Sequence, residues 1–253
     1  MTAAASRPAR GRPAAPGAAA LPVGSGRGVL ASAAAALESF FLEAVELPPA
    51  SDATEPLGLR PVIAVFGLAR GCGATVIARA LAAELAVRDP GAAAAVLGEA
   101  RPGGIPLATH AATRLARVLE DVPGAAPRAV GRLCLVGAAD PLRLSDVTRH
   151  HAPLVIDSGS GALGGASASV ADRVVLVTTT DVEPALARVG AECIARVGPA
   201  PIVVLNRAPH DQRGAFALPN SPMGARLALG GREARGQLGT AIAELAHLCE
   251  EEV

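Results

Sequence analysis

Residues 61–86, PVIAVFGLARGCGATVIARALAAELA, carry the strongest structural signal in the chain. An apolar run precedes a glycine-rich turn and an alanine-rich segment, which is the order of strand, tight loop and helix that holds phosphate groups on a helix N-terminus. Loops of this kind carry a lysine, but this stretch has none. Two interpretations follow: a phosphate loop that lacks its main cation, or a turn of similar composition.

Apolar runs alternate with helical patterns along the rest of the chain. This alternation predicts an α/β fold, a doubly wound and mainly parallel sheet with helices on both faces. The predicted strands are residues 62–67, 93–98, 132–137, 152–157, 173–178 and 201–206. The predicted helices are residues 74–88, 109–121, 183–197 and 238–250.

The N-terminal part differs in composition from the rest. Its first residues are rich in Ala, Pro, Gly and Arg and hold no acidic residue, which predicts disorder. Leu37, Phe41 and Val45 then repeat at the spacing of one helix face. The predicted organisation is a disordered arm (1–27), a helix (28–47), a linker (48–56) and an α/β domain (57–253).

Composition narrows the classes of partner and compartment. The formal net charge is zero, with 23 basic residues that are all arginine. Nothing in that balance calls for nucleic acid, except through the N-terminal arm, and we expect no membrane partner because the chain ends in HLCEEEV. The widely spaced Cys72, Cys134, Cys193 and Cys249 are expected to be buried free thiols in a reducing cytoplasm.

Three predicted strand ends carry candidate ligand-binding residues, and such sheets bind ligands at the carboxyl ends of their strands. Gly71 and Gly73 would let backbone N–H groups turn toward a phosphate, and the Thr75 hydroxyl is placed for Mg²⁺. Asp157 would bring a carboxylate toward the same metal. Asn206 offers a donor and an acceptor to the edge of a base.

Each polar candidate also has a structural interpretation. Asp157 is equally suited to cap the turn after its strand, and Asn206 to form a turn. Thr75 is placed to cap the following helix, a role that does not exclude metal binding. The sequence alone leaves these alternatives open.

Taken in order, these features resemble the MinD/ParA family of deviant P-loop ATPases, whose loop reads K-G-G-x-G-K-[ST]. The aligned positions here are Ala69, Arg70, Gly71, Cys72, Gly73, Ala74 and Thr75. The resemblance covers residues 61–250 and includes Asp157, the adenine-reading position Asn206 and a closing segment at 217–246. The loop segment GCGAT is most similar to the TadZ/CpaE branch, which is associated with the assembly and positioning of Tad (Flp) pili.

The sequence departs from that family at the charged positions. Ala69 replaces the signature lysine that reaches the partner's nucleotide in the family dimer, and Ala74 replaces the lysine that holds the β- and γ-phosphates. Glu99 stands near the place of an Asp-x-Asp pair but out of phase with it. Because phosphoryl transfer depends on positioning and neutralising charge, efficient ATP hydrolysis is not expected. Arg70 and Arg207 are available as substitute cations, or else they are solvated surface side chains.

The resemblance therefore implies a pseudo-ATPase that positions or scaffolds other proteins, with Tad/Flp pilus assembly as one setting. The implied cofactor is ATP or ADP with Mg²⁺, held weakly or not at all, and the implied partners are protein cargo and a second copy of the chain. The alternatives are an active partitioning ATPase on DNA or membrane, and an interaction module that needs no nucleotide. The implied nucleotide-binding residues are Arg70, Gly71, Cys72, Gly73, Ala74, Thr75, Asn206 and Arg207, with Thr75 and Asp157 for Mg²⁺.

Overall fold

The structure is a computed structural model that describes residues 58–98, 107–160, 163, 165–208 and 215–251. The predictions for the arm (1–27), the helix (28–47), the linker (48–56) and Glu99 lie outside the described residues.

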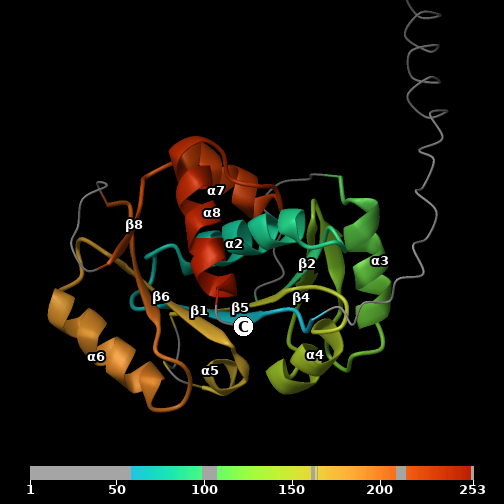
Figure 1. The fold of residues 1–253 in the computed structure, drawn as a ribbon, viewed down its shortest axis with the longest axis horizontal. Helices are drawn as coiled ribbons and strands as arrows, with labels where there is room; N and C mark the ends of the chain where they lie inside the picture. The colour runs from blue at the N-terminus through green and yellow to red at the C-terminus, as the bar shows by residue number, and fades with distance from the viewer. Residues whose placement is uncertain (1–57, 99–106, 161–162, 164, 209–214, 252–253) are drawn as a thin grey trace, which may run out of the picture. The chain divides into compact units, whose positions relative to one another are not determined.

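Eight strands of the described chain form one sheet in the order β3-β4-β2-β5-β1-β6-β7-β8 (Figure 1). Every neighbouring pair is parallel except β3 with β4. The α/β prediction of a doubly wound, mainly parallel sheet is confirmed. The strands are β1 (Val62–Gly67), β2 (Ala94–Leu97), β3 (Arg128–Val130), β4 (Leu133–Val136), β5 (Leu154–Gly159), β6 (Arg173–Thr179), β7 (Ile202–Asn206) and β8 (Phe216–Leu218).

Helices cover both faces of the sheet, and each face has its own apolar core. Side chains alternate along a strand, so Ile63 and Val65 of β1 enter one core while Val62 and Phe66 enter the other. Helices α2, α7 and α8 contribute to the first core and α3, α4, α5 and α6 to the second. The helices are α2 (Ala74–Arg88), α3 (His110–Leu119), α4 (Pro141–Thr148), α5 (Ala166–Val170), α6 (Pro184–Ala195), α7 (Pro222–Leu229) and α8 (Gly236–Glu250).

Helix α2 lies between the sheet and the α7–α8 pair (Figure 1). Its alanine-rich sequence allows this close packing, because small side chains let neighbouring elements approach. Arg79 is buried there, and its Nη1 donates to the carbonyl oxygen of Leu229 at 3.1 Å, at the end of α7. That bond satisfies a carbonyl that has no partner within α7. The bond therefore ties α2 to the end of α7.

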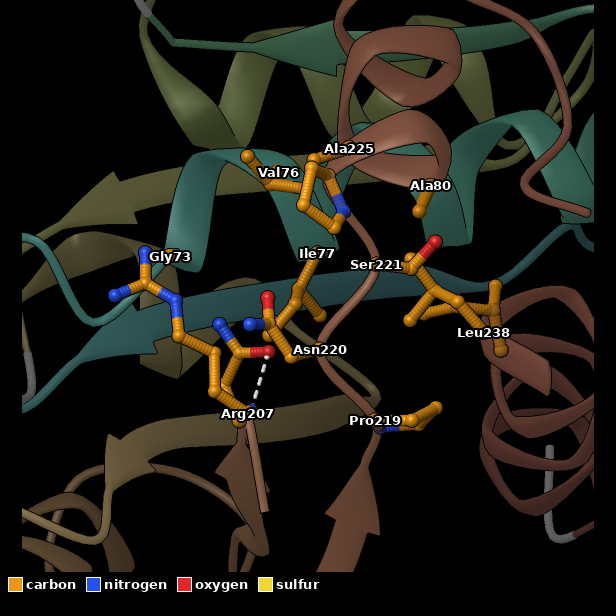
Figure 2. Close-up of a pocket in the computed structure, with 13 residues that line it drawn as sticks. Gly73, Val76, Ile77, Ala80, Arg207, Pro219, Asn220, Ser221, Ala225 and Leu238 are labelled. Atoms are coloured by element: carbon orange, nitrogen blue, oxygen red, sulfur yellow. Dashed lines mark hydrogen bonds between the residues drawn. The ribbon is translucent and has the colours of Figure 1, made fainter. Parts of the chain in front are cut away.

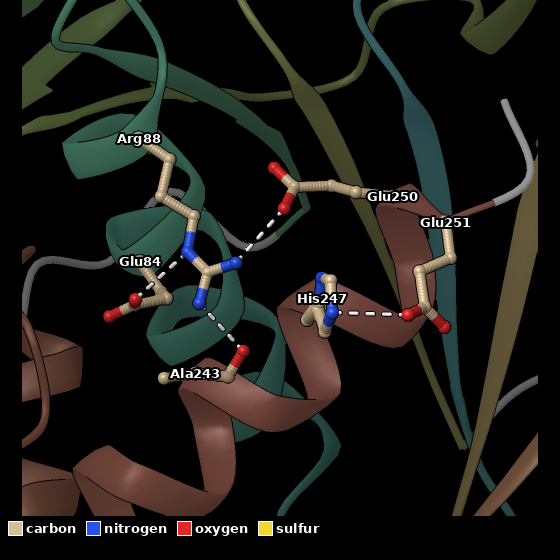
Figure 3. A network of polar contacts seen from close by, with 6 residues as sticks. All are labelled: Glu84, Arg88, Ala243, His247, Glu250 and Glu251. Atoms are coloured by element: carbon tan, nitrogen blue, oxygen red, sulfur yellow. Dashed lines mark hydrogen bonds and ion pairs between the residues drawn. The ribbon is translucent and has the colours of Figure 1, made fainter.

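A polar network joins α2 to α8 (Figure 3). Arg88 donates to Glu84 at 3.1 Å, to Glu250 at 3.0 Å and to the carbonyl oxygen of Ala243 at 2.7 Å. The three charged side chains are 18 to 35% exposed, so water screens their attraction. The network adds to the apolar contacts between the two helices.

Five short elements were not predicted from the sequence: β3, β8, α4, α5 and α7. The cysteine prediction is confirmed for three thiols, but it is wrong for Cys193, which is exposed on α6. Burial raises the pKa of the Cys134 and Cys249 thiols to about 12. None of the described helices combines the length and the hydropathy needed to span a bilayer.

Candidate functional site

The glycine-rich turn after β1 has the backbone of a loop that opens toward a helix N-terminus. Gly71 and Gly73 adopt φ values of 80° and 93°, in the left-handed region that glycine enters without a Cβ penalty. Gly73 is the N-cap of α2, and no side chain caps this helix. The first N–H groups of α2 therefore have no side-chain acceptor there. The proposed capping role of Thr75 is wrong, because Thr75 lies within the first turn.

Asn206 at the end of β7 holds the loop in place. Its Nδ2 donates to the carbonyl oxygen of Cys72 at 2.8 Å, and its Oδ1 accepts from the N–H of Arg207 at 3.0 Å. A Cβ on Gly73 would lie 2.3 Å from the same Nδ2. The amide keeps one N–H and one lone pair for another partner. Asn206 thus positions the loop, whether or not it also contacts a base.

Two pockets adjoin the loop, one on each side of Gly73. We call the first the helix pocket: it has a volume of about 330 Å³ and lies between α2, α7, α8 and the end of β7 (Figure 2). The second, the loop pocket, has a volume of about 470 Å³. Gly73, Val76 and Arg207 line both of them, so the two pockets adjoin at these residues, and we refer to the pair together as the cleft.

The cleft gathers all eight residues predicted for nucleotide binding. Those in the loop pocket are Arg70, Gly71, Cys72, Gly73, Ala74, Thr75 and Arg207. Asn206 lines the helix pocket. Their roles toward a ligand stay predictions, because placement in a cleft does not by itself establish binding.

Asp157, predicted for Mg²⁺, lines neither pocket but lies next to the loop pocket through Gly159. Its Oδ1 accepts from the N–H of Gly159 at 3.1 Å. One of the two carboxylate oxygens therefore caps the turn after the strand, as one of the two interpretations predicts. The β5 strand bulges here, since its pairing with β1 shifts between Val65 and Phe66. The other carboxylate oxygen and the Thr75 hydroxyl are hard donors of the kind that Mg²⁺ prefers.

The charge of the cleft comes from two side chains. Arg70 and Arg207 are its cationic lining residues, both exposed, and no acidic residue of the described chain lines either pocket. Ala74 is only 5% exposed and belongs to the core around α2. The lysine positions of the family loop therefore contribute no charge, and the arginines are the groups that could meet an anion.

The outer wall of the helix pocket was not predicted from the sequence. Its signal was present in the segment 217–246, where Asn, Ser and Pro follow one another after β8 and mark a turn leading into a helix. Which of these residues would face the pocket depended on how α7 and α8 pack on α2. The wall consists of Pro219, Asn220, Ser221, Pro222, Ala225, Leu238 and Ile242.

Solved structures share this fold. The chain is similar to a ParA family ATPase from Chlorobium tepidum TLS, with a TM-score of 0.51 and 18% identity over 74% of this chain and 99% of that one. It is also similar to the MinC:MinD cell division protein complex of Aquifex aeolicus, with a TM-score of 0.50 and 16% identity over 76% and 97%. No protein-family model and no curated protein matches the sequence. The shared feature is the ParA/MinD type of P-loop fold.

Proposed function

We propose that this chain is a nucleotide-binding scaffold or positioning protein of the ParA/MinD type that hydrolyses ATP slowly or not at all. The observation that carries the proposal is the cleft around Gly73: it keeps the loop geometry and a pocket on each side although both lysines are missing.

In this proposal the nucleoside lies in the helix pocket and the phosphates lie in the loop pocket. Val76, Ile77 and Leu238 give the helix pocket an apolar wall, as suits a base. The start of α2 supplies N–H groups and the positive end of the helix dipole to the phosphates. Asn206 and Arg207 lie between the two, since Asn206 lines the helix pocket and Arg207 lines both.

Magnesium would accompany the nucleotide. Thr75 lines the loop pocket, and Asp157 lies on β5 two residues before Gly159, which also lines that pocket, so both could bind Mg²⁺ directly or through water. Magnesium usually takes one or two protein oxygens and completes its shell with water and phosphate. This donor set fits that habit, and the metal would offset phosphate charge.

Slow hydrolysis follows from what the loop lacks. Ala69 and Ala74 cannot neutralise the charge that develops on a transferred phosphoryl group. Loss of such groups lowers phosphoryl transfer by orders of magnitude, whereas backbone N–H groups still permit binding. The chain would therefore act through nucleotide occupancy and protein contacts.

The proposed partners are proteins. Family resemblance supports a cargo or assembly component, with a second copy of the chain as a further partner, and the loop segment GCGAT supports the TadZ/CpaE branch and a cytoplasmic role in Tad/Flp pilus assembly. One structural neighbour is a complex of a MinD protein with MinC.

Thermal unfolding of the full chain with and without Mg·ATP and Mg·ADP tests the proposal. Ligand at about 100 times its Kd adds roughly 2.7 kcal/mol of stability, which raises the midpoint measurably. Ala225→Trp would fill the helix pocket, while Met223→Trp places the same side chain on an exposed part of α7 that does not line it.

We expect a nucleotide-dependent shift in the wild type and in Met223→Trp, and none in Ala225→Trp. A shift that survives Ala225→Trp would place the ligand elsewhere. No shift with any nucleotide would favour an interaction module that needs no nucleotide. Turnover at about 1 s⁻¹ or faster, the ordinary range of active enzymes, would favour an active partitioning ATPase.

A further inference from the structure

Arg207 occupies the junction of the helix pocket and the loop pocket. It follows β7 directly, and its side chain extends toward Gly73 (Figure 2). Of the residues that line both pockets, it is the one with a charge, since the others are Gly73 and Val76. A ligand with its base in the helix pocket and its phosphates in the loop pocket would lie close to this side chain.

The backbone of Arg207 is strained. Its φ is 60°, in the left-handed region that side chains other than Asn, Asp and Gly rarely adopt. The Asn206 Oδ1 accepts the Arg207 N–H and thereby holds this conformation. Glycine or asparagine would fit the same backbone with less strain.

The cations lie at different places along the cleft. Arg70 lines only the loop pocket, whereas Arg207 also lines the helix pocket, where the nucleoside would lie. The first phosphate after the nucleoside would therefore meet Arg207, and a more distant phosphate would meet Arg70. In a loop with lysines at positions 69 and 74, the charge would concentrate on the distant phosphates instead.

We infer that Arg207 binds the phosphate nearest the nucleoside, so that a nucleoside monophosphate already gains a charge-assisted contact. This inference rests on the proposed nucleotide-binding function and specifies its ligand class as nucleotides, from monophosphates upward, and not nucleosides. Arg70 would add a separate contact to a more distant phosphate.

Calorimetric titration of the full chain with adenosine, AMP, ADP and ATP in the presence of Mg²⁺ tests this inference, with the guanosine series alongside. The variants are Arg207→Asn, which suits the left-handed backbone, and Arg70→Gln. Arg114→Gln removes an exposed arginine of α3 outside the cleft and controls for overall charge.

In the wild type we expect AMP to bind about tenfold or more tightly than adenosine, as for a charge-assisted contact. Arg207→Asn should remove that difference, while Arg70→Gln and Arg114→Gln should keep it. Arg70→Gln should weaken the binding of ADP or ATP without affecting that of AMP.

Three outcomes would overturn the inference. An AMP-to-adenosine difference that survives Arg207→Asn would remove the role of Arg207. An AMP affinity no higher than that of adenosine in the wild type would show that the first phosphate makes no such contact. If the wild type binds neither nucleosides nor nucleotides, the proposed function fails and the inference fails with it, whereas in the other two outcomes nucleotide binding stands.

Discussion

Adding a single methyl group at Gly73 should weaken the fold far more than adding one at Gly71. Both glycines have left-handed backbones, with φ values of 93° and 80°. The surroundings differ, because a Cβ on Gly73 would lie 2.3 Å from the Asn206 Nδ2, while a Cβ on Gly71 meets nothing within 4 Å. The pair therefore separates backbone strain from the loss of the contact between Asn206 and the loop.

The expected magnitudes follow from these two terms. A left-handed alanine costs about 1–2 kcal/mol, and the stiffer unfolded chain returns about 0.4–1 kcal/mol, so Gly71→Ala should lower the free energy of unfolding by about 1 kcal/mol. Gly73→Ala must also displace the Asn206 amide from the Cys72 carbonyl. This breaks a hydrogen bond worth about 1 kcal/mol and leaves the carbonyl oxygen of the buried Cys72 without that donor. Its total cost should be about 2–3 kcal/mol.

Urea and thermal unfolding of the two variants provide the assay. A domain of this size loses about 2–4 °C in midpoint per kcal/mol, so the two variants should differ by several degrees. Asn206→Ala removes the side chain that the new methyl group strikes, so the double variant Gly73→Ala/Asn206→Ala should cost less than the sum of its parts by about 1 kcal/mol. Equal destabilisation by Gly71→Ala and Gly73→Ala, with additive costs in the double variant, would refute the loop-holding role of Asn206.

The described contacts lead to four further predictions. Arg207→Asn should raise the free energy of unfolding by up to about 1 kcal/mol, because asparagine tolerates the left-handed backbone; a loss of stability in urea unfolding would contradict the strain. Cys193 should react with a thiol reagent at pH 8 in the folded protein, whereas Cys134 and Cys249 should react only on unfolding. Burial raises the pKa of those two thiols to about 12, whereas an exposed thiol has a pKa of about 8.5. Between these two pH values the unfolded chain binds fewer protons than the folded one, so the free energy of unfolding should fall as the pH rises from about 8.5 to 12. A free energy of unfolding that does not change over this range would count against the burial of the two thiols. Arg88→Ala should lower the free energy of unfolding by at most about 1 kcal/mol, because its partners are partly exposed. A larger loss would show that the network contributes more than ordinary surface ion pairs do.

Much of the fold could be predicted from local patterns. The ranges 62–67 and 74–88 match β1 and α2 to the residue, because a continuous apolar run ends at glycine and an alanine-rich helix ends before Asp-Pro. The central strands of a parallel sheet are buried on both faces, so their sequences are apolar throughout and easy to recognise.

The edges of the sheet could not be predicted in the same way. β3 and β8 are three residues each and pair at the two margins, where neither a long apolar run nor strict alternation is needed. For α4 and α7 a usable signal was missed: Asp140 and Ser221 cap the helices that begin with Pro141 and Pro222. A cap residue followed by proline is a start signal that does not depend on helix length.

The candidate residues could be grouped from the sequence, but their contacts could not. Loop glycines, Asn206 and Arg207 could be chosen because strand ends meet at one edge of the sheet. The contact of Asn206 with Cys72 and the position of Arg207 between two pockets depend on how β7 lies against the loop, which residue spacing does not encode.

The most direct test of the central claim is to return a lysine to the loop and measure nucleotide affinity. If the cleft is a phosphate site that lacks its cations, calorimetric titration with Mg·ATP should show weak binding to the wild type. Ala74→Lys should then bind about 10–100-fold more tightly, the value of a charge-assisted hydrogen bond of about 1.5–3 kcal/mol. Leu142→Lys, an exposed position on α4 outside the cleft, should leave the affinity unchanged. If a folded Ala74→Lys variant binds no better than the wild type, the loop is not a phosphate site and the account is wrong.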